Sequence, residues 1–273
     1  MATPDEPAKE RIVVAVDASA ASLLALELAA DLAAALGTRL AGLYVEEEEL
    51  LHVAGLPFGR LVRAQSGELA PFTADELERQ WRAMAAEARA ALTRAAQARH
   101  IACSFEVVRG RAAQVMAEAA RGARLASLGS SGARGARIGS VARAALAATD
   151  ASLLLVPPRR RAGVRWLAVL DTPGTAPAVL AMAAALGEAG AASAPLLALT
   201  PAIEDALPTG AGLAPGAALP RQGLSENAQL PELFALLHAQ RVQGLILGAD
   251  SRFAQASAVE ALLADGWPLL LVR

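Results

Sequence analysis

The sequence predicts an α/β protein built from two tandem doubly wound domains. Each domain is expected to have a mostly parallel five-stranded sheet, and the second domain is shortened. Two observations support this prediction. Short apolar runs alternate with helix-like segments along all 273 residues, as in β-α-β units whose parallel sheet is covered on both faces. The same order of segments then starts again near residue 164, in a sequence that is 55% hydrophobic and 19% charged.

Five strands and four helices alternate in the first half of the sequence. The strands are expected at residues 11–17, 39–45, 104–110, 125–128 and 152–156. The helices are expected over residues 22–36, 73–99, 111–121 and 141–148. Asp17 and Ser19 can cap the first helix and Gly37 can close it, while Thr73 and Glu76 form a capping box for the second. Strands that alternate with helices in this way predict a parallel sheet.

Two segments between these elements have an unusual composition. Residues 46–49 are four consecutive glutamates. A metal site is conceivable there, but consecutive side chains point in different directions and no histidine is placed to help, so we interpret them as a solvated charge run. Residues 52–71 are rich in glycine and proline and predict a long loop that could act as a lid. His52, His100 and His238 are scattered without the spacing of metal ligands, so no metal site is predicted.

The second half is a shortened and degenerate repeat of the first. Its strands are expected at residues 164–171, 194–200, 217–222, 244–248 and 269–272, and its helices over residues 175–190, 231–240 and 254–264. Residues 201–220 are rich in glycine, proline and alanine, and a loop is expected there in place of the long helix. Both halves close on the same run, Leu-Leu-Leu-Val. Such a repeat predicts two similar domains, residues 1–158 and 164–273, joined by a linker of residues 159–163.

A glycine-rich loop between the fourth strand and the following helix is the strongest candidate for a ligand site. It begins Gly129-Ser-Ser-Gly132, ends Gly139-Ser140 and enters the helix at Val141. Backbone N–H groups and the positive end of the helix dipole would point into the crevice at the strand's carboxyl end, which suits a phosphate. The alternative is a tight connection in which glycine only tolerates a positive φ.

Composition narrows the possible classes of function. The net charge of −2 gives no reason to expect a nucleic-acid partner. No apolar run reaches the ~20 residues of a membrane span, and residues 1–10 lack the apolar core of a signal peptide. The single cysteine, Cys103, is expected to be a small buried residue in a reducing compartment. A soluble cytoplasmic protein is therefore predicted.

The motifs of common nucleotide-dependent and hydrolytic enzymes are missing from the sequence. The glycine spacing does not fit the dinucleotide fingerprint, and no lysine follows the loop as in a P-loop. Ser130 and Ser131 have no evident histidine partner. We therefore predict that the protein is not an enzyme, apart from slow ATP hydrolysis as a third option.

The strand ending in Asp17, the order of elements and the glycine loop resemble the universal stress protein family in its tandem, two-domain form. Nucleotide-binding members of this family carry Gly-x2-Gly, nine further residues, and then Gly-Ser or Gly-Thr. Gly129, Gly132, Gly139 and Ser140 match both ends of this pattern, but six residues separate the ends here instead of nine. The resemblance implies an adenine-nucleotide α-hydrolase-like fold over nearly the whole sequence.

The resemblance also implies an ATP site at the carboxyl edge of the first sheet, with Mg²⁺ as an accompanying ion. Asp17 and the backbone at Ala15 would meet the adenosine moiety, and the backbone at Val45 would meet adenine. The ribose and phosphates would be surrounded by Gly129, Gly132, Gly139, Ser140 and Val141. In the second half only Asp171 and Gly248 are kept, so that half is expected to be structural.

Two classes of function follow for the whole protein. One is a nucleotide-binding stress or regulatory protein whose ligand state alters its interaction with a protein partner. The other is an interaction module that has kept the fold and lost the ligand. In both, we expect the two closing strands to pair within one molecule as an internal pseudo-dimer, because an exposed apolar edge favours aggregation. A further homodimer would be compatible with this arrangement.

Overall fold

Along the chain, strands and helices follow one another as the sequence predicts. The structure is a computed structural model that describes residues 11–54, 56, 60–62, 69–130, 139–148, 150–159, 165–188, 195–206 and 220–273. The sheet strands of the first half are β1 (Arg11–Ala15), β2 (Arg39–Glu47), β5 (Cys103–Gly110), β6 (Leu125–Gly129) and β7 (Ser152–Val156). Those of the second half are β8 (Arg165–Leu170), β9 (Leu196–Leu199), β10 (Arg221–Gly223), β11 (Val242–Gly248) and β12 (Leu269–Val272).

Helices connect these strands in both halves. The first half contains α1 (Ala20–Ala35), α2 (Glu48–Ala54), α3 (Ala74–Ala98), α4 (Ala112–Ala120) and α5 (Ser140–Ala148). The second contains α6 (Ala176–Glu188), α7 (Pro201–Ala206), α8 (Leu230–Ala239), the short helix η2 (Arg252–Ala254) and α9 (Ala256–Ala264). The predicted caps are confirmed, since the side chain of Ser19 accepts from Ser22 N and that of Thr73 accepts from Glu76 N. Gly37 follows α1 with a φ of +62°.

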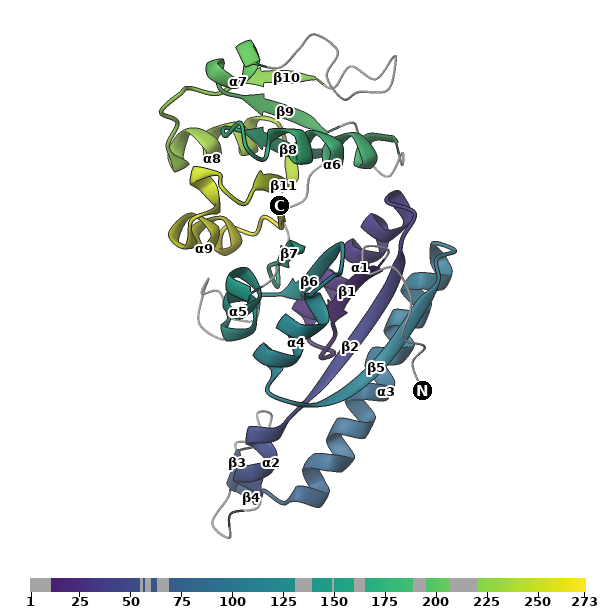
Figure 1. Cartoon of the computed structure of the whole chain (residues 1–273). Helices are drawn as coiled ribbons and strands as arrows, with labels where there is room; N and C mark the ends of the chain where they lie inside the picture. The colour runs from purple at the N-terminus through teal and green to yellow at the C-terminus, as the bar shows by residue number, and fades with distance from the viewer. Residues whose placement is uncertain are drawn as a thin grey trace.

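All ten strands form one continuous sheet, which confirms the predicted α/β class. The strand order is β10-β9-β8-β11-β12-β7-β6-β1-β2-β5, and the two halves lie end to end along it (Figure 1). Every neighbouring pair is parallel except β7 and β12. Read outward from that antiparallel pair, each half has the same strand order. The predicted pairing of the closing strands is thus confirmed, with Leu154 opposite Leu270.

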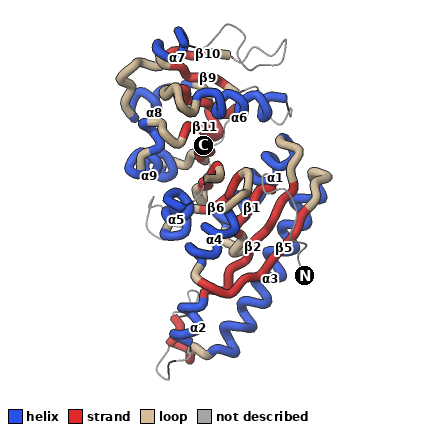
Figure 2. The backbone as a smooth tube through the Cα atoms, in the orientation of Figure 1, coloured by secondary structure: helices blue, strands red, loops and turns tan. Residues whose placement is uncertain are grey.

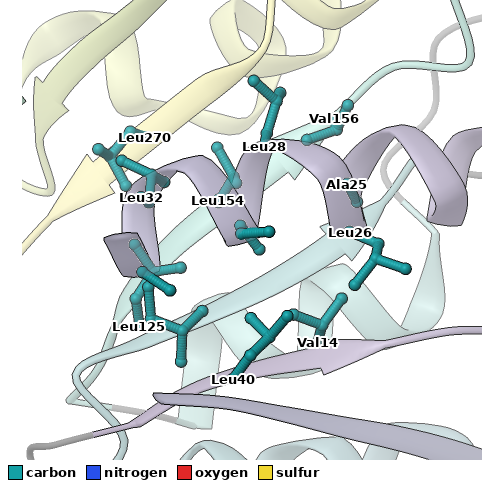
Figure 3. Close-up of a cluster of buried hydrophobic side chains, with 14 of the residues drawn as sticks. Val14, Ala25, Leu26, Leu28, Leu32, Leu40, Leu125, Leu154, Val156 and Leu270 are labelled. Carbon is teal, nitrogen blue, oxygen red and sulfur yellow. The ribbon is translucent and has the colours of Figure 1, made fainter. Parts of the chain in front are cut away.

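Two hydrophobic clusters cover the two faces of the sheet. Alternate residues of one strand divide between them, so that Ile12 and Val14 belong to one cluster and Val13 to the other. The first cluster contains residues of α1, α3 and α6, and the second contains residues of α4, α5, α8 and α9. Figure 2 shows these helices on both sides of the strands. In the first cluster, Leu32 of α1 lies beside Leu270 of β12 (Figure 3), so the core crosses from one half to the other.

Regular secondary structure occurs in two segments that were expected to be loops. The loop predicted over residues 52–71 gives way to α2 at its start and to an antiparallel pair of short strands, β3 (Arg60–Val62) and β4 (Leu69–Pro71). Glutamates favour a helix N-terminus, and Glu48 and Glu49 begin α2 with exposed side chains. Similarly, Pro201 begins α7 where a loop was expected, because proline is compatible with a first helical turn.

Cys103 and part of the glutamate run also differ from expectation. Cys103 is exposed, not buried, because β5 is the last strand of the sheet and only β2 lies beside it among the residues that the structure describes. Glu46 and Glu47 belong to β2 and both have partners, the guanidinium of Arg109 and the backbone N of Ala112. The predicted solvated run is therefore confirmed for Glu48 and Glu49, whereas Glu46 and Glu47 are only half-exposed and paired.

Candidate functional site

A cavity of about 470 Å³ lies where the carboxyl ends of β1, β2 and β6 meet. Parallel sheets bind ligands at this kind of strand-end crevice. Five of the eight predicted site residues line it, namely Ala15, Asp17, Val45, Gly129 and Val141. Gly139 and Ser140 stand directly before Val141 at the start of α5. Gly132 lies outside the residues that the structure describes.

The carboxylate of Asp17 is held in place at the end of β1. Its Oδ1 accepts a hydrogen bond from the backbone N of Ser19 at 2.9 Å, and its own N donates to Ser22 Oγ at 3.3 Å. Burial by itself would raise the pKa of Asp17, but hydrogen bonds from Ser19 and Ser22 outweigh burial and lower that pKa. An ionised acceptor therefore faces the cavity and can receive a hydrogen bond from a hydroxyl or amine of a ligand.

Gly129 is required by a close approach of α1 to the end of β6. A Cβ at this position would lie 2.7 Å from both the carbonyl carbon of Ala21 and the backbone N of Ser22. No side chain fits at such distances. The glycine thus lets the first turn of α1 pass directly over the strand end, which is a reason distinct from the phosphate approach that the sequence suggested.

Aromatic side chains form much of the cavity wall and were missed by the sequence analysis. Tyr44 of β2 and Trp81 of α3 are almost fully buried and line the cavity together with Phe72. The guanidinium of Arg109 lies 5.6 Å from the centre of the Trp81 ring, a favourable cation–π geometry. The sequence placed Trp81 on a helix that covers the sheet, but it gave no sign that this helix also passes over the strand ends. The only feature that marked Trp81 as a candidate cavity residue is that the first half has no other tryptophan.

The charges of the cavity wall are acidic. Among the described residues that line it, Asp17 and Glu47 are the only acidic side chains, and none is a lysine or arginine. Glu47 accepts a hydrogen bond from the backbone N of Ala112 at 3.1 Å, at the start of α4. This part of the cavity therefore suits an uncharged, largely apolar group that carries hydrogen-bond donors.

In the second half, the aspartate at the end of the first strand is bound by the protein itself. Asp171, at the end of β8, has a side chain that is only 1% exposed. Its Oδ2 accepts from Ser251 Oγ at 3.0 Å and from the backbone N of Arg252 at 3.1 Å. The next residue, Phe253, is buried against β11 and its neighbours. The segment after β11 thus already occupies the carboxylate that corresponds to Asp17.

A second carboxylate blocks the start of α6. Asp250 Oδ1 accepts hydrogen bonds from the hydroxyl of Thr172, at 2.7 Å, and from that of Thr175. Burial tends to raise the pKa of Asp250, but these hydrogen bonds outweigh it and lower the pKa. The helix N-terminus therefore already faces a negative charge. Gly248, the counterpart of Gly129, has no room for a Cβ because Thr175 occupies that space.

The described parts of the protein contain neither a metal-ligand cluster nor a membrane-spanning helix. No group of three or more histidine, cysteine, aspartate or glutamate side chains is arranged there to hold a metal ion. Within the same parts, no helix is both long and apolar enough to cross a membrane.

Comparison with known proteins points to one family. Residues 9–157 match the model of the universal stress protein family. A universal stress protein from Archaeoglobus fulgidus DSM 4304 is similar in structure, with a TM-score of 0.64, 14% identity, and coverage of 96% of this chain and 98% of that one. The functionally unknown protein PA1789 from Pseudomonas aeruginosa PAO1 is also similar, with a TM-score of 0.56, 12% identity, and coverage of 97% and 92%. At such identities the likeness shows the fold alone. No curated protein sequence matches this one.

Proposed function

Because the protein belongs to the universal stress protein family, we propose that residues 1–158 bind ATP or another adenine nucleotide. The ligand state would then control interaction with a protein partner during a stress response. Residues 164–273 would be a structural unit that holds no nucleotide, with residues 159–163 as the linker between the two. The protein would act through binding and not as an enzyme.

The cavity at the ends of β1, β2 and β6 is the observation on which this proposal depends. Its volume lies within the range of small-molecule pockets, and its wall combines apolar and aromatic groups with a few polar ones, as such pockets do. Val45 and Ala15 would provide backbone contacts to the adenine and adenosine. Asp17 would accept a hydrogen bond from a ligand hydroxyl or amine. The aromatic side chains of Tyr44 and Trp81 would enclose the base.

The phosphates would extend away from the acidic wall and toward the start of α5. Gly139, Ser140 and Val141 stand at this helix N-terminus, where backbone N–H groups favour an anion. Gly129 and Gly132 would complete the loop around the ribose and phosphates. A Mg²⁺ ion would be held by the phosphates, because the described residues offer no metal cluster of their own.

Titration calorimetry with ATP tests this proposal. We expect Gly132→Val to abolish binding, because a side chain would stand where the backbone approaches phosphate. Ser140→Ala should weaken binding by ~1 kcal/mol, or up to ~3 kcal/mol if the hydroxyl bonds a charged oxygen. Asp250→Asn is the matched control in the second half and should leave the affinity unchanged. Full affinity in Gly132→Val would contradict the assignment.

The second candidate function is an interaction module without a ligand. The short loop favours it, since six residues stand between Gly132 and Gly139 where nucleotide-binding members have nine. The acidic cavity wall also supplies no cation for a phosphate. If no adenine nucleotide binds at millimolar concentration, this function is the better one. Insertion of three residues between Arg134 and Gly139 should then restore binding if the short loop is the cause.

A further inference from the structure

A second hollow, the arginine groove, lies between α3 and β5. Its volume is about 630 Å³. Phe105 and Val107 of β5 contribute apolar surface, and Arg82, Arg89 and Arg94 of α3 contribute charge. The groove shares no lining residue with the proposed nucleotide cavity, although α3 contributes to both.

The arginine groove has a positive charge that the described residues do not neutralise. All three arginines are exposed, and none of them forms an ion pair with a described acidic residue. Arg82 Nε donates only to the backbone O of Glu78, at 3.2 Å, and the guanidinium of Arg89 lies 5.1 Å from the centre of the Phe105 ring. The only carboxylate among the lining residues is that of Glu46, and it already accepts two hydrogen bonds from Arg109, at 2.9 and 3.0 Å.

Beside these arginines, β5 presents a long open edge. All eight of its residues are paired with β2 in unbroken register, and among the described residues no strand lies on its other side. The carbonyl of Ala102 accepts a hydrogen bond from Leu40 N and therefore points toward β2. Successive residues of a strand direct their N–H and C=O groups to opposite sides. The backbone groups of Cys103, Phe105 and Val107 therefore point away from β2, toward the open edge. Val107 is 40% exposed. Such an edge, without proline or bulge, is a template for another strand.

We propose that the arginine groove docks an acidic, extended segment of a partner protein, which adds to the edge of β5 as an extra strand. Backbone hydrogen bonds would give affinity, and alternate acidic side chains would select the segment. Side chains on one face of a strand repeat every ~6.8 Å. Arg82 and Arg89, seven residues apart on α3, are ~10 Å apart along the helix axis. Acidic side chains at successive same-face positions of the added strand can therefore reach different arginines of the groove. This inference deepens the interaction part of the proposed function.

Two other occupants fit the arginine groove less well. A second copy of this protein paired through β5 would bring two sets of arginines together, and like charges oppose such an association. A single-stranded nucleic acid could meet the arginines and Phe105, but it offers no strand partner for the open backbone groups. An acidic peptide satisfies both the charge and the edge.

Fluorescence anisotropy with a labelled ten-residue peptide of alternating glutamate and threonine tests the charge of the groove. We expect saturable binding to the full-length protein that weakens as salt is added. Arg89→Glu should weaken binding by about tenfold or more. Arg121→Glu makes the same change in charge on an exposed residue after α4, on the other face of the sheet, and should have no effect. A peptide of alternating lysine and threonine should not bind.

The open edge is tested by Val107→Pro, which removes one outward N–H and leaves the pairing with β2 in place. We expect this variant to bind the peptide several-fold more weakly while its melting temperature and its ATP titration stay unchanged. Absence of saturable binding would overturn the inference, as would equal binding of the lysine peptide or binding of oligouridylate in place of the acidic peptide. A dimer that dissociates in Val107→Pro would assign the open edge to a second copy instead. Because ATP is titrated separately, failure of either proposal can be distinguished from failure of the other.

Discussion

At the residue scale, Asp17 shows how a carboxylate is held at the end of β1. Its carboxylate is fixed by the backbone N of Ser19 and by the hydroxyl groups of Ser19 and Ser22. The resemblance to the family implied this aspartate as a site residue, and its position alone indicated only a helix cap. The hydrogen bonds that keep it ionised depend on the first turn of α1, and the sequence indicated them only through the two serines.

The lowered pKa of Asp17 predicts a pH dependence of stability. A carboxylate whose pKa is lowered in the folded state stabilises that state above its usual pKa of 3.8, and this contribution is lost as the pH falls through the lower, folded value. Asp17→Asn should therefore reduce the free energy of unfolding at pH 7 by less than about 1 kcal/mol, because solvent screens the exposed carboxylate. Urea titrations should show that wild type and variant converge at acid pH. A difference that grows at low pH would contradict this explanation.

Trp81 predicts a spectroscopic signal of ligand binding. It lines the cavity, whereas the other two tryptophans, Trp166 and Trp267, are buried in the second half. Addition of ATP should change the tryptophan fluorescence of the wild type. The change should be absent in Trp81→Phe, which keeps an aromatic wall, and should persist in Trp166→Phe. An unaltered response in Trp81→Phe would place the ligand elsewhere.

At the element scale, the close approach of α1 to β6 predicts how much stability is lost when a methyl group is added at Gly129. Gly129→Ala should destabilise the protein by about 1–3 kcal/mol, because the added Cβ would overlap the backbone of α1 and overpacking has this cost. Gly223→Ala is the control, since a Cβ on β10 would meet nothing within 4 Å, and its effect should stay within about 0.5 kcal/mol. Chemical denaturation of both variants measures the difference. Equal stabilities would refute the close approach.

Most elements could be predicted because each has a local signal. Strands 11–17 and 269–272 are continuous apolar runs, and Thr73 with Glu76 marks the start of α3. What the sequence could not give is the order of strands in the sheet, which depends on the crossovers between them. Cys103 was therefore expected to be buried, although β5 is an edge strand. For the same reason the sequence missed Trp81 as a cavity residue, since its contact with the strand ends depends on how α3 crosses the sheet.

At the scale of the whole molecule, the pairing of β7 with β12 joins two halves of equal strand order. Leu270 lies opposite Leu154 and is fully buried, and it belongs to the same cluster as α1 of the other half. Leu270→Ala should therefore lower the free energy of unfolding by about 2–5 kcal/mol. Val107→Ala, on the exposed edge of β5, should change it by no more than about 0.5 kcal/mol. A small effect of Leu270→Ala in a urea titration would contradict the buried junction.

The two halves differ at the carboxyl ends of their strands, so the second half can serve as an internal control for ligand binding by the first. In the first, the strand ends surround a cavity and Asp17 faces it. In the second, Asp171 is bound by Ser251 and Arg252, and Asp250 faces the start of α6. The sequence predicts a structural second half from the loss of the glycine pattern and from the negative charge of Asp250. The structure places Asp250 against the hydroxyl groups of Thr172 and Thr175, directly before α6.

The number of nucleotides held by one molecule tests this account most directly. A native mass spectrum of the full-length protein, recorded with increasing ATP, would count them. We predict a single saturating adduct that is lost in Gly132→Val and kept in Asp250→Asn. Two adducts per molecule, or one adduct that survives Gly132→Val, would contradict the assignment of the site to the first half.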